Sequence, residues 1–265
     1  MKHRGFTLIE LLVVIAMVII LLAILIAALN GVRQQAKTLK CSSNINQLTR
    51  DLIIYRDINH AFPYGFRDSF IDEPPGGFPG NAKLDRTAWW WFNILEGNDN
   101  YAKKRTLQCP SKSLRHPGLM DNVLYGNYGV NRSICKSPVD IRKYKKDFVG
   151  APLGDEDIPN PSQTLLIIDS GYSVISWWHA TDIPPEPFEG SKGEDTGYVP
   201  GLPINKDKNN LMLDQKEDAE DGRHSNKTVN VGFADGHIDR KKADDLFVEK
   251  EGDTYTNRRP LWVPK

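Results

Sequence analysis

The chain has 265 residues, with 34 basic and 34 acidic side chains and a formal net charge of zero. This balance gives no reason to expect a nucleic-acid partner, because binding to phosphates depends on a surplus of Lys and Arg. About 200 residues follow the N-terminal helix predicted below, which is enough for one hydrophobic core. The 3 cysteines are an odd number, which in an oxidising compartment predicts one disulfide and one free thiol.

The N-terminal region contains an uninterrupted apolar run from Leu11 to Leu29. At 1.5 Å per residue, a helix of this length crosses the hydrocarbon core of a bilayer. The acidic residue Glu10 stands directly before the run and separates it from the apolar residues that begin at Phe6. A charged side chain at membrane depth costs at least ~2.5 kcal/mol, so we expect Glu10 to have a function.

Three interpretations of this terminus compete. A secretory signal peptide has an apolar region of about 7–15 residues that ends at a small-residue cleavage site. Here the run is longer and continues past Ala27 and Ala28 into a helical pattern. A plain signal anchor requires the membrane span but has no need of Gly5, Phe6 or Glu10. The third interpretation accounts for all three of these residues.

The basic leader, the Gly5-Phe6 junction and Glu10 ahead of a spanning run together resemble the signal of type IV prepilins and type II secretion pseudopilins. This resemblance implies that a prepilin peptidase cleaves the chain after Gly5 and that the new terminal residue, Phe6, is N-methylated. It also implies that Glu10 pairs with the terminal amine of a neighbouring subunit during assembly. Such pairing is physically reasonable, since an acid in lipid is stabilised most by a cation at the same depth.

The resemblance also implies a location and partners. Residues 1–5 are expected to be a cytoplasmic leader, and residues 6–29 a single transmembrane helix in the lipid of the inner (cytoplasmic) membrane. The C-terminal domain is then periplasmic or displayed on an extracellular fibre. The expected partners are other pilin-like subunits and an inner-membrane assembly platform. Charge alone does not set this orientation, because basic residues flank both ends of the span.

Residues 30–57 are predicted to continue the helix beyond the membrane. Apolar side chains recur there at steps of three and four residues, which is typical of an amphipathic helix, and no proline interrupts residues 6–61. We therefore predict one long helix to about residue 57, with half in lipid and half laid on the soluble domain. Its expected contact stripe is Val32, Ala36, Leu39, Ile45, Leu48, Leu52 and Tyr55.

Residues 58–265 are predicted to form a loop-rich α+β domain with an antiparallel sheet. Residues 88–95 contain consecutive tryptophans and are expected to form a compact buried helix, with a carbohydrate-binding platform as the alternative. Residues 164–169 are typical of a buried strand. Residues 183–222 are rich in proline and acidic side chains, which predicts a long surface excursion.

The clearest local signal is a hairpin at residues 228–240. Its first strand alternates so that Val229, Val231 and Phe233 fall on one face, which we expect to be the core side. The dipeptide Asp235-Gly236 suits a two-residue turn in which both central residues have positive φ. The chain shows no internal repeat.

The soluble part resembles a branch of prepilin-like proteins with a C-terminal motif of a histidine, nine residues and Asp-Gly (H-x9-DG). In this chain residues 225–234 separate His224 from Asp235, which is one residue more than the motif has. An insertion in the loop before the strand accommodates the difference, but it puts in doubt any role that needs a fixed His224–Asp235 geometry. The matching segments are Cys41–Asn44, Gln47-Leu48, Tyr55, Phe62-Pro63, Cys109–Ser111, Tyr125–Asn131, Pro161–Thr164 with Asp169, Arg223-His224 and Phe233–Ile238.

This second resemblance favours Cys41 and Cys109 as a disulfide pair, because both lie in matching segments and would tie the long helix to the domain. A bridge between Cys109 and Cys135 is the alternative. A zinc site is not expected, because the chain has no Cys-x2-Cys or Cys-x2-His spacing.

Four side chains form the group that most resembles a metal site: His224, Asp235, His237 and Asp239. Their carboxylates favour calcium over a transition metal, and we expect no other cofactor. The alternative is that Asp235 belongs only to the hairpin turn and His237 begins the return strand, in which case the four do not share one face.

The sequence contains no nucleophile motif and no phosphate-binding glycine loop. We therefore predict a membrane-anchored, pilin-like structural subunit rather than an enzyme. The competing hypothesis is a signal-anchored periplasmic enzyme or carbohydrate-binding module that uses His224, His237 and the tryptophans.

Overall fold

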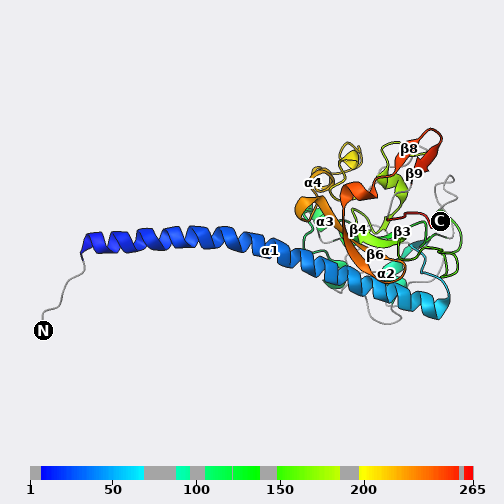
Figure 1. The fold of residues 1–265 in the computed structure, drawn as a ribbon, viewed down its shortest axis with the longest axis horizontal. Coiled ribbons are helices and arrows are strands. Elements are labelled where there is room, and N and C mark those ends of the chain that lie inside the picture. Colours follow the sequence, from blue (N-terminus) through cyan, green and yellow to red (C-terminus); the bar gives the residue numbers. More distant parts are fainter. Residues whose placement is uncertain are drawn as a thin grey trace.

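The computed structural model describes residues 7–68, 88–95, 105–120, 122–137, 148–185, 197–256 and 260–264. Its longest element is the helix α1, Leu8–Asn59, whose 52 residues extend over about 78 Å (Figure 1). The helix begins after the N-cap Thr7 and is followed by the C-cap His60, whose left-handed conformation is common just after a helix. The prediction of one long helix is confirmed, with its end at Asn59 instead of residue 57.

The two halves of α1 have different surroundings. Every described side chain from Leu8 to Lys37 is exposed, and this stretch of about 45 Å projects from the domain (Figure 1). The first buried side chain is that of Thr38. From there one face of the helix is buried in steps of three and four residues, at Thr38, Cys41, Asn44, Ile45, Leu48, Thr49 and Leu52.

The predicted contact stripe is therefore correct from Ile45 onward and wrong before it. Val32 is 60% exposed because it lies in the projecting part of α1, before the helix reaches the domain. Leu39 is 66% exposed because Thr38 and Cys41, and not Leu39, occupy the side of the helix that is buried. Polar residues occupy the buried face instead. For example, Asn44 donates hydrogen bonds to Gln108 O at 3.0 Å and to the Tyr128 hydroxyl at 3.1 Å.

The domain is built on a five-stranded sheet in the order β5-β3-β4-β6-β7. Antiparallel pairs join β3 to β4, β4 to β6 and β6 to β7, whereas β5 runs parallel to β3. The α+β class is confirmed, but the sheet is mixed, because the chain reverses after β4 and adds β5 at the edge of β3. The strands are β3 (Tyr128–Asn131), β4 (Leu165–Asp169), β5 (Val174–Ile175), β6 (Thr228–Phe233) and β7 (Ile238–Lys242).

The remaining described elements are short. They are the strands β1 (Phe66–Asp68), β2 (Ala88–Trp90), β8 (Glu249–Glu251) and β9 (Thr254–Thr256), and the helices α2 (Trp91–Ile94), α3 (Pro117–Met120) and α4 (Leu213–Asp221). Single turns of 3-10 helix lie at η2 (Arg105–Leu107), η4 (Trp177–Ala180), η5 (Pro203–Asn205), η6 (Ser225–Lys227) and η7 (Ala243–Leu246). Strand β1 pairs with β2, and β8 pairs with β9.

Hydrophobic cores lie on both faces of the sheet. The buried face of α1 packs on one side against residues that include Val130 and Ile167. On the other side the predicted core positions of β6, Val229, Val231 and Phe233, are buried as expected. The described tryptophan side chains are all core residues, none more than 8% exposed, so they offer no carbohydrate-binding platform; they are Trp90, Trp91, Trp177, Trp178 and Trp262.

Two predicted segments differ from the structure. Residues 88–95 do not form one helix, because their first three residues pair with β1 and only one helical turn follows. Aromatic side chains suit a strand as well as a buried helix, which explains the error. The described part of residues 183–222 is a surface excursion only at its start, where Ile183 is exposed; Tyr198, Val199 and Leu202 are buried, and α4 follows.

The hairpin of β6 and β7 is present, but the turn contains three residues. Phe233 N donates a hydrogen bond to His237 O at 2.9 Å and so encloses Ala234, Asp235 and Gly236. Of these three, Gly236 alone has a positive φ, at 96°. The expectation of two positive-φ residues is wrong, because the chain uses the three-residue hairpin loop with glycine in the left-handed position.

Gly232 allows α1 to approach the sheet closely. A Cβ atom at this position would collide with Thr49 Oγ1 and lie 2.8 Å from Ile167 Cγ2. The Thr49 hydroxyl is held in place because it donates to Ile45 O at 2.7 Å. We therefore expect Gly232→Ala to lower the free energy of unfolding by about 1–3 kcal/mol, measured by thermal unfolding of the full chain in detergent.

The matched control is Gly31→Ala, since a Cβ at Gly31 meets nothing within 4 Å. Alanine favours helix over glycine, so this variant should unfold at the same temperature as the parent or slightly higher. Equal unfolding temperatures for both variants would contradict the close packing at Gly232.

Candidate functional site

The N-terminal end of α1 is closed by a capping box. Thr7 Oγ1 accepts a hydrogen bond from Glu10 N at 3.3 Å, and Glu10 Oε2 accepts from Thr7 N and from Thr7 Oγ1, each at 2.8 Å. This capping box was not predicted above, although Thr-x-x-Glu ahead of an apolar run is its typical sequence signal. The predicted processing residues Gly5 and Phe6 lie outside the described residues.

The capping box leaves half of the Glu10 carboxylate unused. Both bonds from Thr7 go to Oε2, and Oε1 has no partner among the described residues. The side chain is exposed. A carboxylate can accept bonds at both oxygens, so Glu10 can cap its own helix and accept a further donor at the same time.

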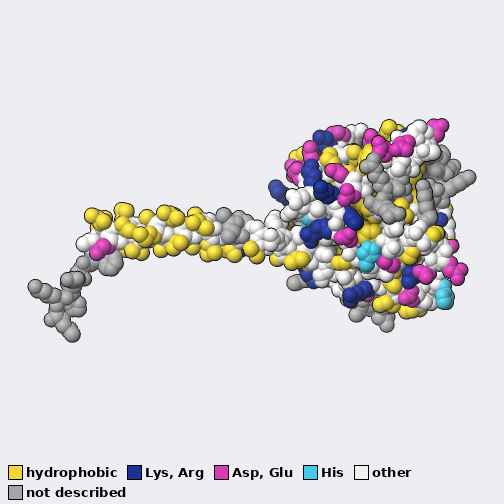
Figure 2. Space-filling view, viewed as in Figure 1, with side chains coloured by type: hydrophobic (Ala, Val, Ile, Leu, Met, Phe, Trp, Pro, Cys, Tyr) yellow, Lys and Arg dark blue, Asp and Glu magenta, His cyan; other side chains and the backbone are white. Residues whose placement is uncertain are grey.

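The projecting half of α1 is long and apolar enough to cross a membrane. It is the one helix among the described residues that meets this condition, and its most apolar stretch is entirely unburied within the chain. Figure 2 shows apolar side chains along the helix where it extends away from the domain. Such a surface needs lipid or other apolar helices around it, because water disfavours an exposed apolar area of this size.

A buried histidine meets α1 where the helix enters the domain. His224 Nδ1 lies 3.1 Å from Thr38 Oγ1, and His224 Nε2 lies 3.1 Å from Asp169 Oδ2. The side chains of His224 and Asp169 are both fully buried. Asp169 Oδ2 also accepts hydrogen bonds from Asn230 N at 2.7 Å and Asn230 Nδ2 at 2.9 Å. This contact joins α1 to β4 and β6, and we refer to it as the helix junction.

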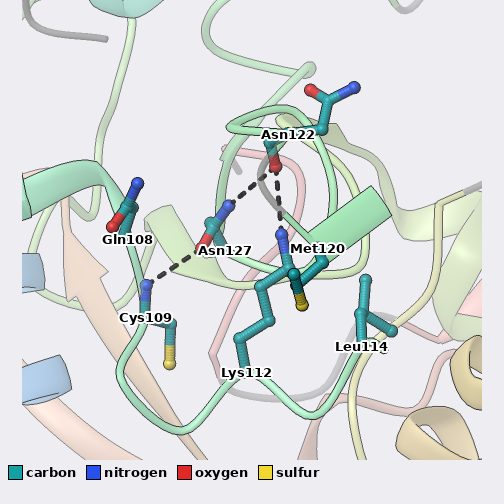
Figure 3. Close-up of a pocket in the computed structure, with 7 residues that line it drawn as sticks. All are labelled: Gln108, Cys109, Lys112, Leu114, Met120, Asn122 and Asn127. Atoms are coloured by element: carbon teal, nitrogen blue, oxygen red, sulfur yellow. Dashed lines mark hydrogen bonds between the residues drawn. The ribbon is translucent and has the colours of Figure 1, made fainter. Parts of the chain in front are cut away.

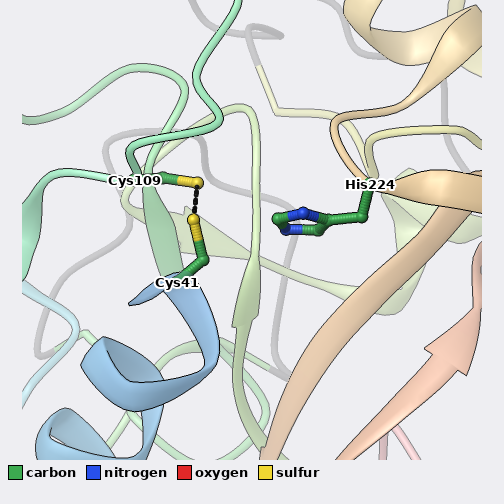
Figure 4. A group of neighbouring side chains, drawn as sticks. All are labelled: Cys41, Cys109 and His224. Carbon is green, nitrogen blue, oxygen red and sulfur yellow. Dashed lines mark hydrogen bonds between the residues drawn. The ribbon is translucent and has the colours of Figure 1, made fainter. Parts of the chain in front are cut away.

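Two thiols lie beside the helix junction. Cys41 Sγ on α1 is 2.7 Å from Cys109 Sγ, and both residues are buried. Figure 4 shows the His224 ring directed toward the pair, and one donor atom from each of the three residues lies within 4.8 Å of the others. The hydrogen bond from the Cys109 thiol lowers the pKa of Cys41, whereas burial raises the pKa of Cys109.

The third cysteine lies elsewhere in the core. Cys135 follows β3 and is fully buried, and no other described thiol contacts it. Burial raises the pKa of Cys135, so this thiol stays protonated and unreactive. Of the two alternative pairings, the structure therefore brings together Cys41 and Cys109, and not Cys109 and Cys135.

A buried ion pair supports the segment before His224. Arg223 Nη2 lies 2.7 Å from Asp218 Oδ2 on α4, and both side chains are fully buried. The guanidinium also donates to Asn127 O at 3.0 Å and Ser170 O at 2.9 Å. Burial raises the pKa of Tyr198, so its hydroxyl stays protonated and donates to Asp218 Oδ2 at 2.7 Å. Arg223 thus ties α4 to the loops around β3 and β4.

A cavity of about 190 Å³ borders Cys109 (Figure 3). Its wall is positioned by hydrogen bonds: Cys109 N donates to Asn127 Oδ1 at 2.9 Å, and Lys112 Nζ donates to Leu119 O at 2.7 Å and Asn122 O at 3.0 Å. The cavity is lined by Gln108, Cys109, Lys112, Leu114, Met120, Asn122 and Asn127.

The structure separates the predicted metal-ligand group. His224 is buried at the helix junction, whereas Asp235 and His237 contact each other in the exposed turn, with 2.6 Å between Oδ1 and Nδ1. Asp239 instead pairs with Lys241 at 2.6 Å. The four residues do not form one ligand set. His224 is buried against Asp169, whereas Asp235 and His237 lie at the exposed turn and Asp239 lies on β7.

Comparison with known proteins supports the interpretation of the N-terminus. A family model described as the prokaryotic N-terminal methylation motif matches residues 1–28. No significant match was found among curated proteins or among solved structures. Together with the exposed apolar half of α1, the motif supports a membrane-anchored, type IV pilin-like protein and indicates a structural subunit rather than an enzyme.

Proposed function

We propose that this chain is a prepilin-like subunit that is cleaved after Gly5, N-methylated at Phe6 and assembled into a pilus or a type II secretion-like fibre. The methylation motif at residues 1–28 is the observation that carries this proposal. The projecting apolar half of α1 supports it, because this half can lie in lipid before assembly and against neighbouring helices afterwards.

Partners and location follow from the same proposal. A prepilin peptidase removes residues 1–5, and an inner-membrane platform assembles the chain with other pilin-like subunits. Residues 6–29 span the inner membrane once, and the domain from residue 58 onward lies on the periplasmic side or on the fibre. Residues 30–57 join the two, which agrees with burial that begins at Thr38 on α1.

We also propose that the chain belongs to the branch with the C-terminal H-x9-DG motif. Matching segments that are far apart in the sequence meet at the helix junction: His224 contacts Asp169, and the adjacent Arg223 donates to Asn127 O. Cys41 contacts Cys109 beside them. In this interpretation the histidine of the motif has a structural role, which tolerates the extra residue before Asp235.

The first test is the intact mass of the chain from the membrane fraction. Loss of residues 1–5 together with the gain of one methyl group is the expected result. A variant with Gly5→Val should keep its leader, because the peptidase requires the small residue in the proposed recognition sequence. A full-length parent chain, or a Gly5 variant that is processed as the parent is, would contradict the proposal.

Substitutions in the capping box separate the charge of Glu10 from its capping role. Glu10→Gln keeps an oxygen that accepts the bonds from Thr7 but removes the charge, so we expect normal cleavage and loss of assembly. Thr7→Val removes the capping hydroxyl and keeps the carboxylate, so assembly should persist. Sedimentation of sheared fibres, or crosslinking between subunits in membranes, measures assembly. If both variants assemble equally well, the proposed ion pair at Glu10 is wrong.

A further inference from the structure

We propose that Cys41 and Cys109 form a disulfide that fixes α1 to the domain at the point where the helix emerges. This inference goes beyond processing and assembly. It rests on the proposed function in one respect only, namely that the domain lies in an oxidising compartment.

The two sulfur atoms are already in position. The 2.7 Å between them is shorter than the ~3.5–4 Å at which non-bonded heavy atoms attract each other best. Each thiol is held by its own element: Cys41 lies on the first buried turns of α1, and the Cys109 backbone is fixed by its bond to Asn127 Oδ1. Bond formation therefore requires the two sulfur atoms to move closer by only ~0.7 Å.

A zinc ion fits the same three side chains less well. Two thiolates that bind one tetrahedral zinc at ~2.3 Å lie about 3.8 Å apart, which is much farther than the observed pair. The His224 nitrogens are also engaged. Thr38 Oγ1 donates its only proton to Gln34 O at 3.0 Å, so His224 Nδ1 must donate to Thr38. His224 Nε2 lies 3.1 Å from both Asp169 Oδ2 and Asn230 Nδ2, so both ring nitrogens already have polar partners other than the thiols.

The two thiols are oxidised by exchange with a second disulfide, which we call the donor. Cys41 ionises before Cys109, since the Cys109 thiol donates a hydrogen bond to it. The Cys41 thiolate attacks one sulfur of the donor, and the donor S–S bond breaks with its electron pair on the other sulfur, which takes up a proton. The Cys109 thiol then loses its proton and attacks Cys41 Sγ. The second donor sulfur leaves as a thiolate and is protonated, so two protein thiols are oxidised and the donor is reduced to two thiols.

The proposed disulfide would attach α1 to the domain at the point where the helix becomes buried. Cys41 lies one turn after Thr38, and all described side chains before Thr38 are exposed. Without the bond, α1 is held by packing and by hydrogen bonds such as the one between His224 and Thr38. With it, a pull on the membrane half of α1 passes to the domain through covalent bonds at the first buried turn. The bond also closes a long loop, since 68 positions separate the two cysteines.

The test counts the free thiols of the full chain purified from membranes. The chain is denatured in the presence of iodoacetamide, which alkylates free thiols, and its intact mass is measured. The measurement is repeated on a sample that is reduced before alkylation. We expect one alkyl group before reduction, at Cys135, and three after reduction. Cys41→Ser should raise the count before reduction to two, since it frees Cys109. Cys135→Ala is the matched control, and it should give no alkyl group before reduction while the bond remains.

Reduction of the parent should also lower its unfolding temperature by roughly 10 °C, whereas Cys41→Ser should show no further change on reduction. Alkylation of all three thiols before reduction, a mapped bond between Cys109 and Cys135, or stoichiometric zinc with three free thiols would each overturn the proposal. The same mass spectrum reports the leader and the methyl group separately. Failure of the proposed processing is therefore distinguishable from failure of the disulfide.

Discussion

Replacement of Arg223 by methionine is expected to lower the free energy of unfolding by about 3–5 kcal/mol, because it leaves the Asp218 charge buried without its partner. Methionine fills much of the space but donates no hydrogen bond. The carbonyl groups of Asn127 and Ser170 therefore also lose their donor. Urea unfolding of the full chain in detergent, followed by tryptophan fluorescence, measures the change, since the described indoles all lie in the core.

A double-mutant cycle isolates the ion pair. Asp218→Asn alone should also be strongly destabilising. In the double variant with Arg223→Met, the free energy of unfolding should fall by clearly less than the sum of the decreases in the two single variants. The control is an ion pair made by another acidic residue of α4: Lys206 Nζ lies 3.3 Å from Glu220 Oε1, with both side chains more than two-fifths exposed. Lys206→Met should change stability by less than about 1 kcal/mol. If Arg223→Met and Lys206→Met lowered the free energy of unfolding by similar amounts, burial of the Arg223–Asp218 ion pair would not explain its contribution to stability.

The sequence predicted the elements whose signals are local. Helix α1 was predictable because no proline interrupts it and its apolar run is long, and β4 and the core face of β6 follow from short apolar patterns. The N-terminal signal was likewise recognisable, because Gly5, Phe6 and Glu10 are neighbours in the chain. The capping box of Thr7 and Glu10 is also a local signal, and it could have been predicted from the spacing of these two residues alone.

The errors arose where polar contacts between distant segments decide the structure. Apolar periodicity placed Leu39 on the contact stripe, but α1 is rotated so that Thr38 and Asn44 are buried and hydrogen-bonded. Their partners come from parts of the chain that periodicity does not connect with the helix. The juxtaposition of Cys41 and Cys109 followed from a family resemblance, and the contact supports the pairing while the bond itself stays a proposal.

His224 and His237 were predicted to belong to one metal-ligand group, but only His224 lies at the helix junction. Substitution of each histidine should therefore change stability by different amounts. His224→Gln should lower the free energy of unfolding by about 3 kcal/mol or more, because Asp169 loses a buried partner while its Oδ1 already has none among the described residues. The detachment of α1 from β4 and β6 should also expose the Cys41–Cys109 region to reductant. Unfolding curves and the rate of reduction under native conditions measure both effects.

His237→Gln is the matched control, since it also breaks a His–Asp contact, but one at the surface. The His237 and Asp235 side chains are 45% and 33% exposed, so water replaces the lost contact and the change should stay below about 1 kcal/mol. A metal site shared by the two histidines predicts the opposite pattern, in which either substitution removes the same bound ion and the same stabilisation. Equal effects of the two variants would favour that shared site, whereas a large loss confined to His224→Gln assigns the histidine of the motif to the attachment of α1.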